Sequence, residues 1–132
     1  KLRNIKHELY AAYTDKEKVY LVNKNLPENA DDYLMCIRAE AETFSILSPF
    51  FFKDSSCVFF KEKRIPGADP AGFQVLSTNY AKDSRQVYHK NCSLPEAHAA
   101  SFTIRKSKKS DAADQKNIYM KGKILQPDTS KE

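Results

Sequence analysis

The stretch from Phe51 to Leu76 reads FFKDSSCVFFKEKRIPGADPAGFQVL, and it contains one complete copy of the unit from which the fold is built. Moving the sequence along itself by 29 residues places the stretch on residues 80–105, with 9 of 26 paired positions identical. Asp54 falls on Asp83, and Phe73 falls on Phe102. An ungapped match of this length indicates an internal repeat, and a period near thirty is typical of stacked supersecondary units.

Two further copies extend the repeat in both directions. Tyr13-Thr14-Asp15 matches Phe52-Lys53-Asp54 at an offset of 39, and Ile118-Tyr119 matches Val87-Tyr88 at an offset of 31. The first copy carries an insertion of about ten residues between Pro27 and Phe44. We therefore predict a single repeat domain over residues 1–132, with units at about 10–47, 50–76, 79–105 and 110–125.

The repeated unit predicts a β-hairpin followed by a short helical corner. An aromatic strand reaches Asp54, a residue that favours tight turns, and a second strand follows over 58–65. Asp69 is a good helix N-cap and Pro70 a good first helical residue, so ADPAGF predicts one helical turn. The fold class expected is mainly β, a β-rich α+β fold with about four antiparallel hairpin repeats.

The inserted segment of the first unit has a different character. ENADDYLMCIRAEAETF contains many helix formers and few β-formers, and we predict one helix near residues 30–43. Residues 1–9 fit either a strand or a helical lead-in. The polar tail, residues 126–132, is expected to be disordered.

Composition bounds the possible functions. The chain has 132 residues, is 41% hydrophobic and carries a formal net charge of +5. This charge fits either simple solubility or an acidic partner. Its densest basic run, RKSKKS at 105–110, lacks interleaved aromatics and favours a solvated loop, so we expect no nucleic-acid partner. No apolar run approaches the length of a membrane span.

Three cysteines are present: Cys36, Cys57 and Cys92. An odd number leaves either three thiols or one disulfide with one spare thiol, and the sequence does not choose between them. The chain begins at Lys1 rather than Met, which is compatible with removal of a leader peptide. The expected location is the periplasm or cell envelope if a leader preceded Lys1, and the cytoplasm if none did.

The stretch YAKDSRQVYHKN, with ADPAGFQVLSTN before it, resembles the repeated unit of the bacterial DKNYY family. The matching segments include Ala68-Asp69-Pro70, Tyr80-Ala81-Lys82-Asp83, Val87-Tyr88 and Gly122-Lys123. His98-Ala99 departs from the Asp-Pro of the family pattern. The resemblance implies a bacterial protein without a described catalytic centre, often made with a leader peptide or lipoprotein signal. Some family members lie beside toxins in interbacterial competition loci.

Several side chains invite a chemical interpretation, and the repeat weakens each one. One aspartate stands at the same turn position of every unit, which predicts a structural turn rather than paired acids; these are Asp15, Asp54, Asp83 and Asp114. His89, Cys92 and His98 lack a recognised zinc spacing. Cys57 has no base at a fixed distance, and its counterpart is Gln86. We predict no catalytic, cofactor or metal site.

Seven aromatic residues recur in register, and they fit either a stacked core or an exposed ladder for a ligand such as glycan or peptide. They are Phe51, Phe59, Phe73, Tyr80, Tyr88, Phe102 and Tyr119. We predict the stacked core, because large rings dominate the packing of a chain that has no tryptophan.

Positions that differ between units are the natural places for a partner surface, because the common fold does not need them. The partner-binding residues predicted on this ground are Lys61, Lys63, Arg64, Arg85, Lys106, Lys108 and Lys109. We expect a non-catalytic binding protein, most concretely an immunity-type inhibitor of a toxin with an acidic patch. The alternative is an envelope-associated structural scaffold, lipid-anchored in its precursor, without a tight partner.

Overall fold

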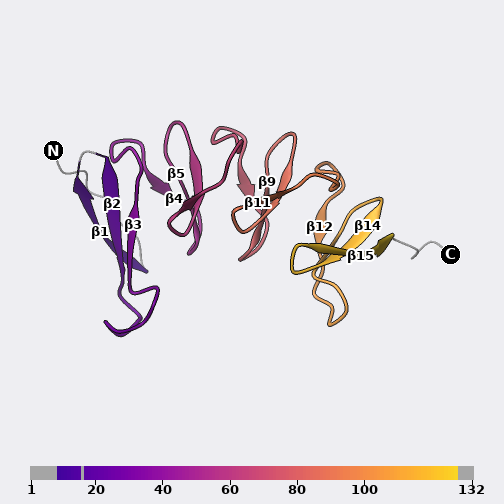
Figure 1. Ribbon diagram of the computed structural model, residues 1–132, viewed down its shortest axis with the longest axis horizontal. Helices are drawn as coiled ribbons and strands as arrows, with labels where there is room; N and C mark the ends of the chain where they lie inside the picture. Colours follow the sequence, from indigo (N-terminus) through magenta and orange to yellow (C-terminus); the bar gives the residue numbers. More distant parts are fainter. Residues whose placement is uncertain (1–8, 16, 128–132) are drawn as a thin grey trace. The chain divides into compact units, whose positions relative to one another are not determined.

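The computed structural model describes residues 9–15 and 17–127. These residues form strands β1 to β15 in antiparallel sheets, and none of them lies in a helix (Figure 1). Internal contacts divide the chain into two compact units, Lys1–Ile65 and Pro66–Glu132. The expectation of a mainly β chain is confirmed.

The first unit begins with a three-stranded sheet in the order β1-β2-β3, whose strands lie side by side in Figure 1. The strands are β1 (Tyr10–Asp15), β2 (Lys18–Asn23) and β3 (Leu34–Ile37). Burial alternates along β2, where Val19 and Leu21 are fully buried, because successive side chains of a strand point to opposite faces.

A second sheet completes the first unit in the order β4-β5-β6-β7. It contains β4 (Ser45–Ile46), β5 (Phe51–Lys53), β6 (Val58–Phe60) and β7 (Lys63–Arg64). The two sheets share one core, in which the Phe52 ring packs against Tyr10 and Phe44 at centroid distances of 5.9 and 5.7 Å.

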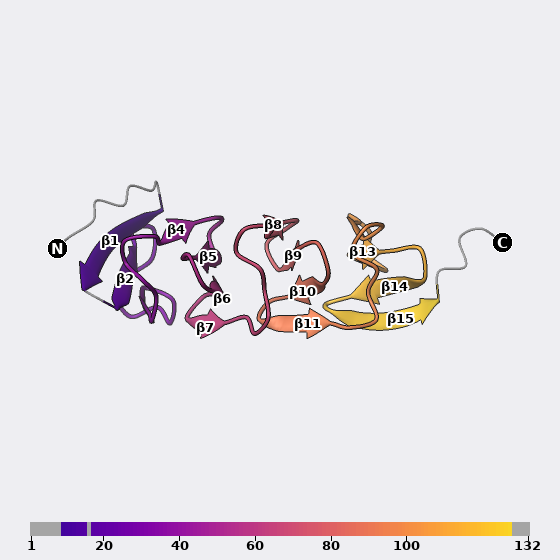
Figure 2. The same cartoon turned by 90° about the horizontal axis from the view of Figure 1, so that it is seen from above.

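The second unit repeats the four-stranded pattern twice. The first of its sheets contains β8 (Gln74–Val75), β9 (Tyr80–Lys82), β10 (Val87–His89) and β11 (Cys92–Leu94). The other contains β12 (Thr103–Ile104), β13 (Ala112–Ala113), β14 (Asn117–Met120) and β15 (Lys123–Pro127). Figure 2 shows β13, β14 and β15 side by side. The two sheets share one core, in which the Phe102 ring contacts Tyr80 of one sheet and Tyr119 of the other.

The predicted second strand of each hairpin is in fact two strands. Residues 58–65 fold back at a two-residue loop between Phe60 and Lys63, and the later repeats do the same. A lysine with positive φ opens each of these loops: Lys61 (54°), Lys90 (56°) and Lys121 (50°). Positive φ at a non-glycine residue is uncommon and allows the chain to reverse within two residues.

The helix predicted at residues 30–43 is absent, and the prediction was wrong. Residues 34–37 instead form β3, where Met35 and Ile37 are buried two positions apart, which is a strand period and not a helical one. Residues 24–33 form a loop with successive turns, closed by hydrogen bonds such as Ala30 N to Pro27 O at 3.0 Å. Pairing with β2 outweighs the helix propensity of the segment.

The predicted helical corners are also absent, since each corner is a hydrogen-bonded turn and not a helical one. Thr43 N donates to Glu40 O at 3.3 Å, and Ser101 N donates to His98 O at the same distance, after which a strand resumes. Asp69 does cap its corner, because its Oδ1 accepts Ala71 N at 3.1 Å. The sequence therefore placed the corner correctly and assigned it the wrong conformation, helical instead of a plain turn.

Six of the seven recurring aromatics are buried, and Phe73 is half-buried against the Tyr88 ring. The stacked-core prediction is confirmed for the buried six. The tail prediction fails at residues 126–127, which belong to β15, while residues 128–132 and 1–8 lie outside the described residues. In the part of the chain that the structure describes, no helix is long and apolar enough to cross a membrane.

Candidate functional site

Three of the four predicted turn aspartates are buried and organise their hairpins in the same way. Oδ1 of each accepts the backbone N–H groups two and three residues later, at 2.7 to 2.9 Å. The three are Asp54, Asp83 and Asp114, exposed by 7%, 4% and 4%. This geometry is an Asx turn, in which the carboxylate replaces a missing backbone acceptor.

The second carboxylate oxygen ties each turn to the preceding corner. Oδ2 accepts a corner N–H from Glu40 at 2.8 Å, from Asp69 at 3.1 Å and from His98 at 2.8 Å. The pairs are Glu40 with Asp54, Asp69 with Asp83, and His98 with Asp114. One aspartate therefore satisfies both the hairpin end and the corner, which explains why a short repeat needs this residue.

Tyrosine hydroxyls complete two of these three sites. Tyr88 donates to Asp83 Oδ2 at 2.7 Å, and Tyr119 donates to Asp114 Oδ2 at 2.8 Å. Burial raises the pKa of Asp83, but the hydrogen bonds from Tyr88 and three backbone N–H groups outweigh it and hold that pKa below its ordinary value. Asp114 follows the same pattern, so both carboxylates are stabilised as anions.

Asp15 departs from the other three turn aspartates. It is an exposed strand residue that pairs with Lys18 across the β1–β2 hairpin. The predicted structural turn thus describes the three buried aspartates. Their carboxylates hold backbone and tyrosine donors instead of facing a cavity where a substrate could reach them.

Two other groups singled out in the sequence are placed by the structure. Cys57 N is a donor of the Asp54 turn, and the thiols of Cys36, Cys57 and Cys92 are unpaired within the described residues. Over residues 9–15 and 17–127, no cluster of three metal-ligating side chains occurs.

Sequence reasoning missed a serine–histidine contact. His98 Nδ1 lies 2.7 Å from Ser101 Oγ, and Ser101 Oγ accepts Gln115 N at 3.0 Å. The first unit places Thr43 Oγ1 2.6 Å from Glu40 Oε1 in the equivalent corner. A Glu–Thr pair replaces the His–Ser pair at the same place in the first unit. The contact is therefore interpreted as a hydrogen bond that stabilises the corner, rather than as a nucleophile with its base.

The seven cationic residues predicted to bind a partner do not share one environment. Lys61 is half-buried, pairs with Asp32 at 3.2 Å and lies 5.0 Å from the Phe50 ring centroid. The other six are exposed: Lys63, Arg64, Arg85, Lys106, Lys108 and Lys109. In the second unit, Arg85 stands in the β9–β10 turn, whereas the three lysines stand in the β12–β13 loop, at opposite ends of their sheets.

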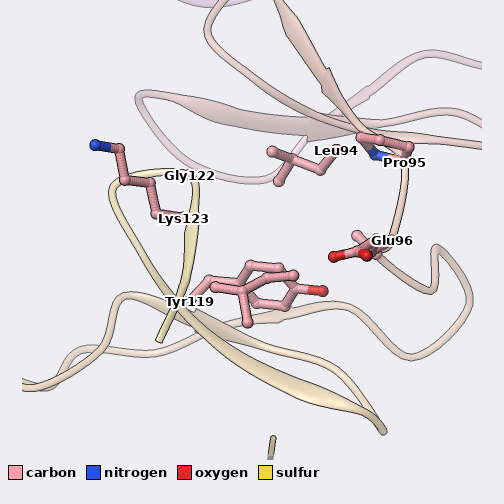
Figure 3. A pocket seen from close by; sticks show the side chains of 8 residues that line it. Leu94, Pro95, Glu96, Tyr119, Gly122 and Lys123 are labelled. Atoms are coloured by element: carbon pink, nitrogen blue, oxygen red, sulfur yellow. The ribbon is translucent and has the colours of Figure 1, made fainter. Parts of the chain in front are cut away.

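A hollow of about 360 Å³ opens on the second unit between the segment Leu94–Ala97 and the β14–β15 hairpin (Figure 3). Leu94, Pro95 and Ala97 form one wall, and Ile124 belongs to the other. Tyr119 lies at the base. Glu96 and Lys123 supply its two charges. Apolar walls with few charged groups are typical of a recognition site.

Burial raises the pKa of Tyr119 to about 12, opposed by a hydrogen bond from Asn117 and assisted by the one to Asp114. This phenol therefore stays neutral at physiological pH and donates to the turn rather than to a molecule in the hollow. Loop residues 95–97 also border a second hollow of about 400 Å³, lined on its other side by Lys116 and Asn117.

The hairpin beside the hollow is held by a close contact with the preceding sheet. A Cβ on Gly122 would lie 2.5 Å from His89 Nδ1, so only glycine fits without a shift. Gly122 N donates to the Tyr80 hydroxyl at 2.9 Å, and that hydroxyl donates to Asp111 at 2.7 Å. His89 therefore packs between the Tyr80 ring and Gly122, and burial together with the charge of Lys90 lowers its pKa.

Comparison with known proteins identifies the family of this chain. The family model described as the DKNYY family matches residues 1–123, and the chain belongs to that family. No curated protein and no solved structure matches the chain significantly. The earlier resemblance, drawn from the aspartate turn and its tyrosine, is confirmed.

Proposed function

We propose that this member of the DKNYY family is a non-catalytic binding protein that neutralises a partner toxin in interbacterial competition. The supporting observation is that recurring and variable residues of the repeat have different environments. The recurring turn aspartate is used internally, since Asp83 receives three backbone N–H groups and one hydroxyl. The edge-strand residues that differ between repeats are exposed, as in β7 and at Cys92 and Ser93 of β11.

The edge strands show this difference most clearly. Lys63-Arg64 in the second repeat corresponds to Cys92-Ser93 in the third and Lys123-Ile124 in the fourth, and all six side chains are exposed. A scaffold that fixes its turns and varies its edge can present a partner-specific surface without altering its fold. The partner class comes from the expectation attached to the family, and the net charge of +5 favours an acidic patch on the partner.

The test is a complex between the purified chain and a toxin encoded next to its gene, with survival of cells that express both. We expect a dissociation constant below about 1 µM, and protection that depends on this chain. A variant carrying Lys63→Glu and Arg64→Glu should bind more weakly if the partner patch is acidic. Absence of both a complex and protection at about 10 µM contradicts the proposal.

A further inference from the structure

The fourth repeat exposes an isoleucine where the second and third repeats place a polar residue. Arg64, Ser93 and Ile124 occupy the same register position, because each pairs with the buried aromatic of its hairpin: Phe59, Tyr88 and Tyr119. Arg64 and Ser93 are the solvent-facing residues expected on a sheet edge. Ile124 is 40% exposed. The scaffold therefore does not need an apolar side chain here.

The next residue changes its environment in the same way. Leu125 corresponds to Ile65, which is 2% exposed, and to Leu94, which packs against the core of the second unit. Leu125 itself is 52% exposed. It stands at a β-bulge, because Tyr119 pairs with Ile124 and Ile118 pairs with Gln126. Two adjacent apolar side chains are thus presented to solvent on one edge strand.

Ile124 borders the hollow already described, which is also lined by Leu94, Pro95 and Ala97. Within the described residues, β15 pairs with β14 alone and forms the edge of its sheet. The bulge at Leu125 interrupts a regular backbone ladder, so recognition here depends on apolar side chains inserted into the hollow rather than on continuous strand addition.

The charges beside the hollow favour an acidic occupant. Lys123 lies at the hollow, and Lys116 lines the adjacent one, while Glu96 borders both. Two cations against one anion border the two hollows, which favours an acidic segment over a basic one.

We propose that this hollow binds an extended segment of the partner protein, apolar at its centre and acidic at its flanks; the assignment rests on the proposed binding function. Leu94, Ala97 and Ile124 contact the apolar centre, and Lys116 and Lys123 face the acidic flanks. A second copy of the chain is disfavoured as the occupant, because its own charge is +5.

Fluorescent peptides test the assignment on the full chain. The probes are the acidic peptide DELVFLED, its basic counterpart KRLVFLKR and the polar control DESTNSED. We expect the acidic apolar peptide to bind at least about tenfold more tightly than either control. Ile124→Ser, which installs the residue of the third repeat, should weaken its binding about tenfold. Leu34→Ser removes an apolar side chain elsewhere that is even more exposed (52% against 40%) and should leave binding unchanged.

Three results overturn the assignment: equal binding of the acidic and basic peptides, equal binding by Ile124→Ser, or a self-associated wild type that Ile124→Ser converts to monomer. The toxin experiment separates the two proposals. If the toxin binds wild type and Ile124→Ser equally, the partner surface lies elsewhere and only the hollow assignment fails. If the toxin binds neither chain but the peptide pattern is obtained, toxin neutralisation fails and the hollow assignment stands.

Discussion

The two compact units build the same aspartate turn with different partners. In the first unit, Asp54 Oδ2 receives Glu40 N, and Phe59 has no hydroxyl to add. In the second unit, Asp83 and Asp114 receive the equivalent backbone N–H and also a tyrosine hydroxyl. The aromatic ring is thus the constant requirement of the repeat, and the hydroxyl is an addition that strengthens a buried acceptor site.

Removing the turn carboxylate in each unit should have the largest effect on stability, and the size of the loss should differ between the units. Asp83→Ala leaves three backbone N–H groups and one hydroxyl without their acceptor, and we expect a loss of about 3 kcal/mol in the free energy of unfolding. Asp54→Ala leaves only three backbone N–H groups without their acceptor and should lower the free energy of unfolding by about 2 kcal/mol.

Urea unfolding followed by circular dichroism measures both losses, and hydrogen exchange assigns each loss to its unit. The exposed Asp15→Ala serves as the control and should change stability by less than about 0.5 kcal/mol. Equal costs for Asp54→Ala and Asp83→Ala contradict the role given to the Tyr88 hydroxyl.

Two glycines of the second unit allow the stability cost of backbone strain to be separated from the cost of side-chain crowding. Gly67 and Gly122 have nearly equal φ values of 77° and 79°, but a Cβ at Gly67 has its nearest neighbour at 3.8 Å, against 2.5 Å at Gly122. Gly67→Ala should therefore cost about 1 kcal/mol, and Gly122→Ala should cost about 2 kcal/mol or more.

The double variant Gly122→Ala with His89→Ala isolates the crowding at this contact. Removing the imidazole should recover about 1 kcal/mol of the Gly122→Ala loss, measured as a double-mutant cycle by thermal unfolding. Strictly additive effects of the two changes mean that the contact between Gly122 and His89 does not carry the cost.

Exchanging phenylalanine and tyrosine beside the turn aspartate gives each unit the aromatic residue of the other. Tyr88→Phe removes the 2.7 Å hydrogen bond to Asp83 and should destabilise the protein by about 1 kcal/mol. Phe59→Tyr offers the missing hydroxyl to Asp54 and should stabilise by about 0.5 kcal/mol. Urea unfolding of both variants gives the comparison, and a loss above about 1 kcal/mol for Phe59→Tyr shows that the first unit has no room for the hydroxyl.

The smallest expected effect is a change with pH in the stability that the tyrosine hydroxyl contributes. The folded-state pKa values of Asp83 and Asp114 are held below 3.8, so unfolding takes up protons as the pH falls. The stability from these shifts is present above about pH 4 and is lost as the pH drops through the folded values. The cost of Tyr88→Phe should fall by about 0.5 kcal/mol between pH 7 and pH 2.5. A cost that does not change with pH indicates that the hydroxyl does not stabilise the carboxylate anion.

The sequence by itself determined the repeat, the turn aspartates and the buried aromatics. A 29-residue offset places Asp83 on Asp54 and Tyr88 on Phe59, which marks one turn aspartate and one buried aromatic residue in each of these repeats. Local patterns also marked the corner at Asp69. These features are readable because turn chemistry and aromatic burial act over a few residues.

Only the tertiary structure decided the length of each element and the position of the hollow. Residues 34–37 pair with β2 because ladder hydrogen bonds and the burial of Met35 and Ile37 outweigh helix propensity. The partner strand is distant in the sequence, so a local sequence pattern does not reveal this pairing. The apolar walls of the hollow come from Leu94 and Ile124, thirty residues apart, and both look unremarkable in sequence. Their meeting depends on how two sheets pack, and packing is a property of the whole unit.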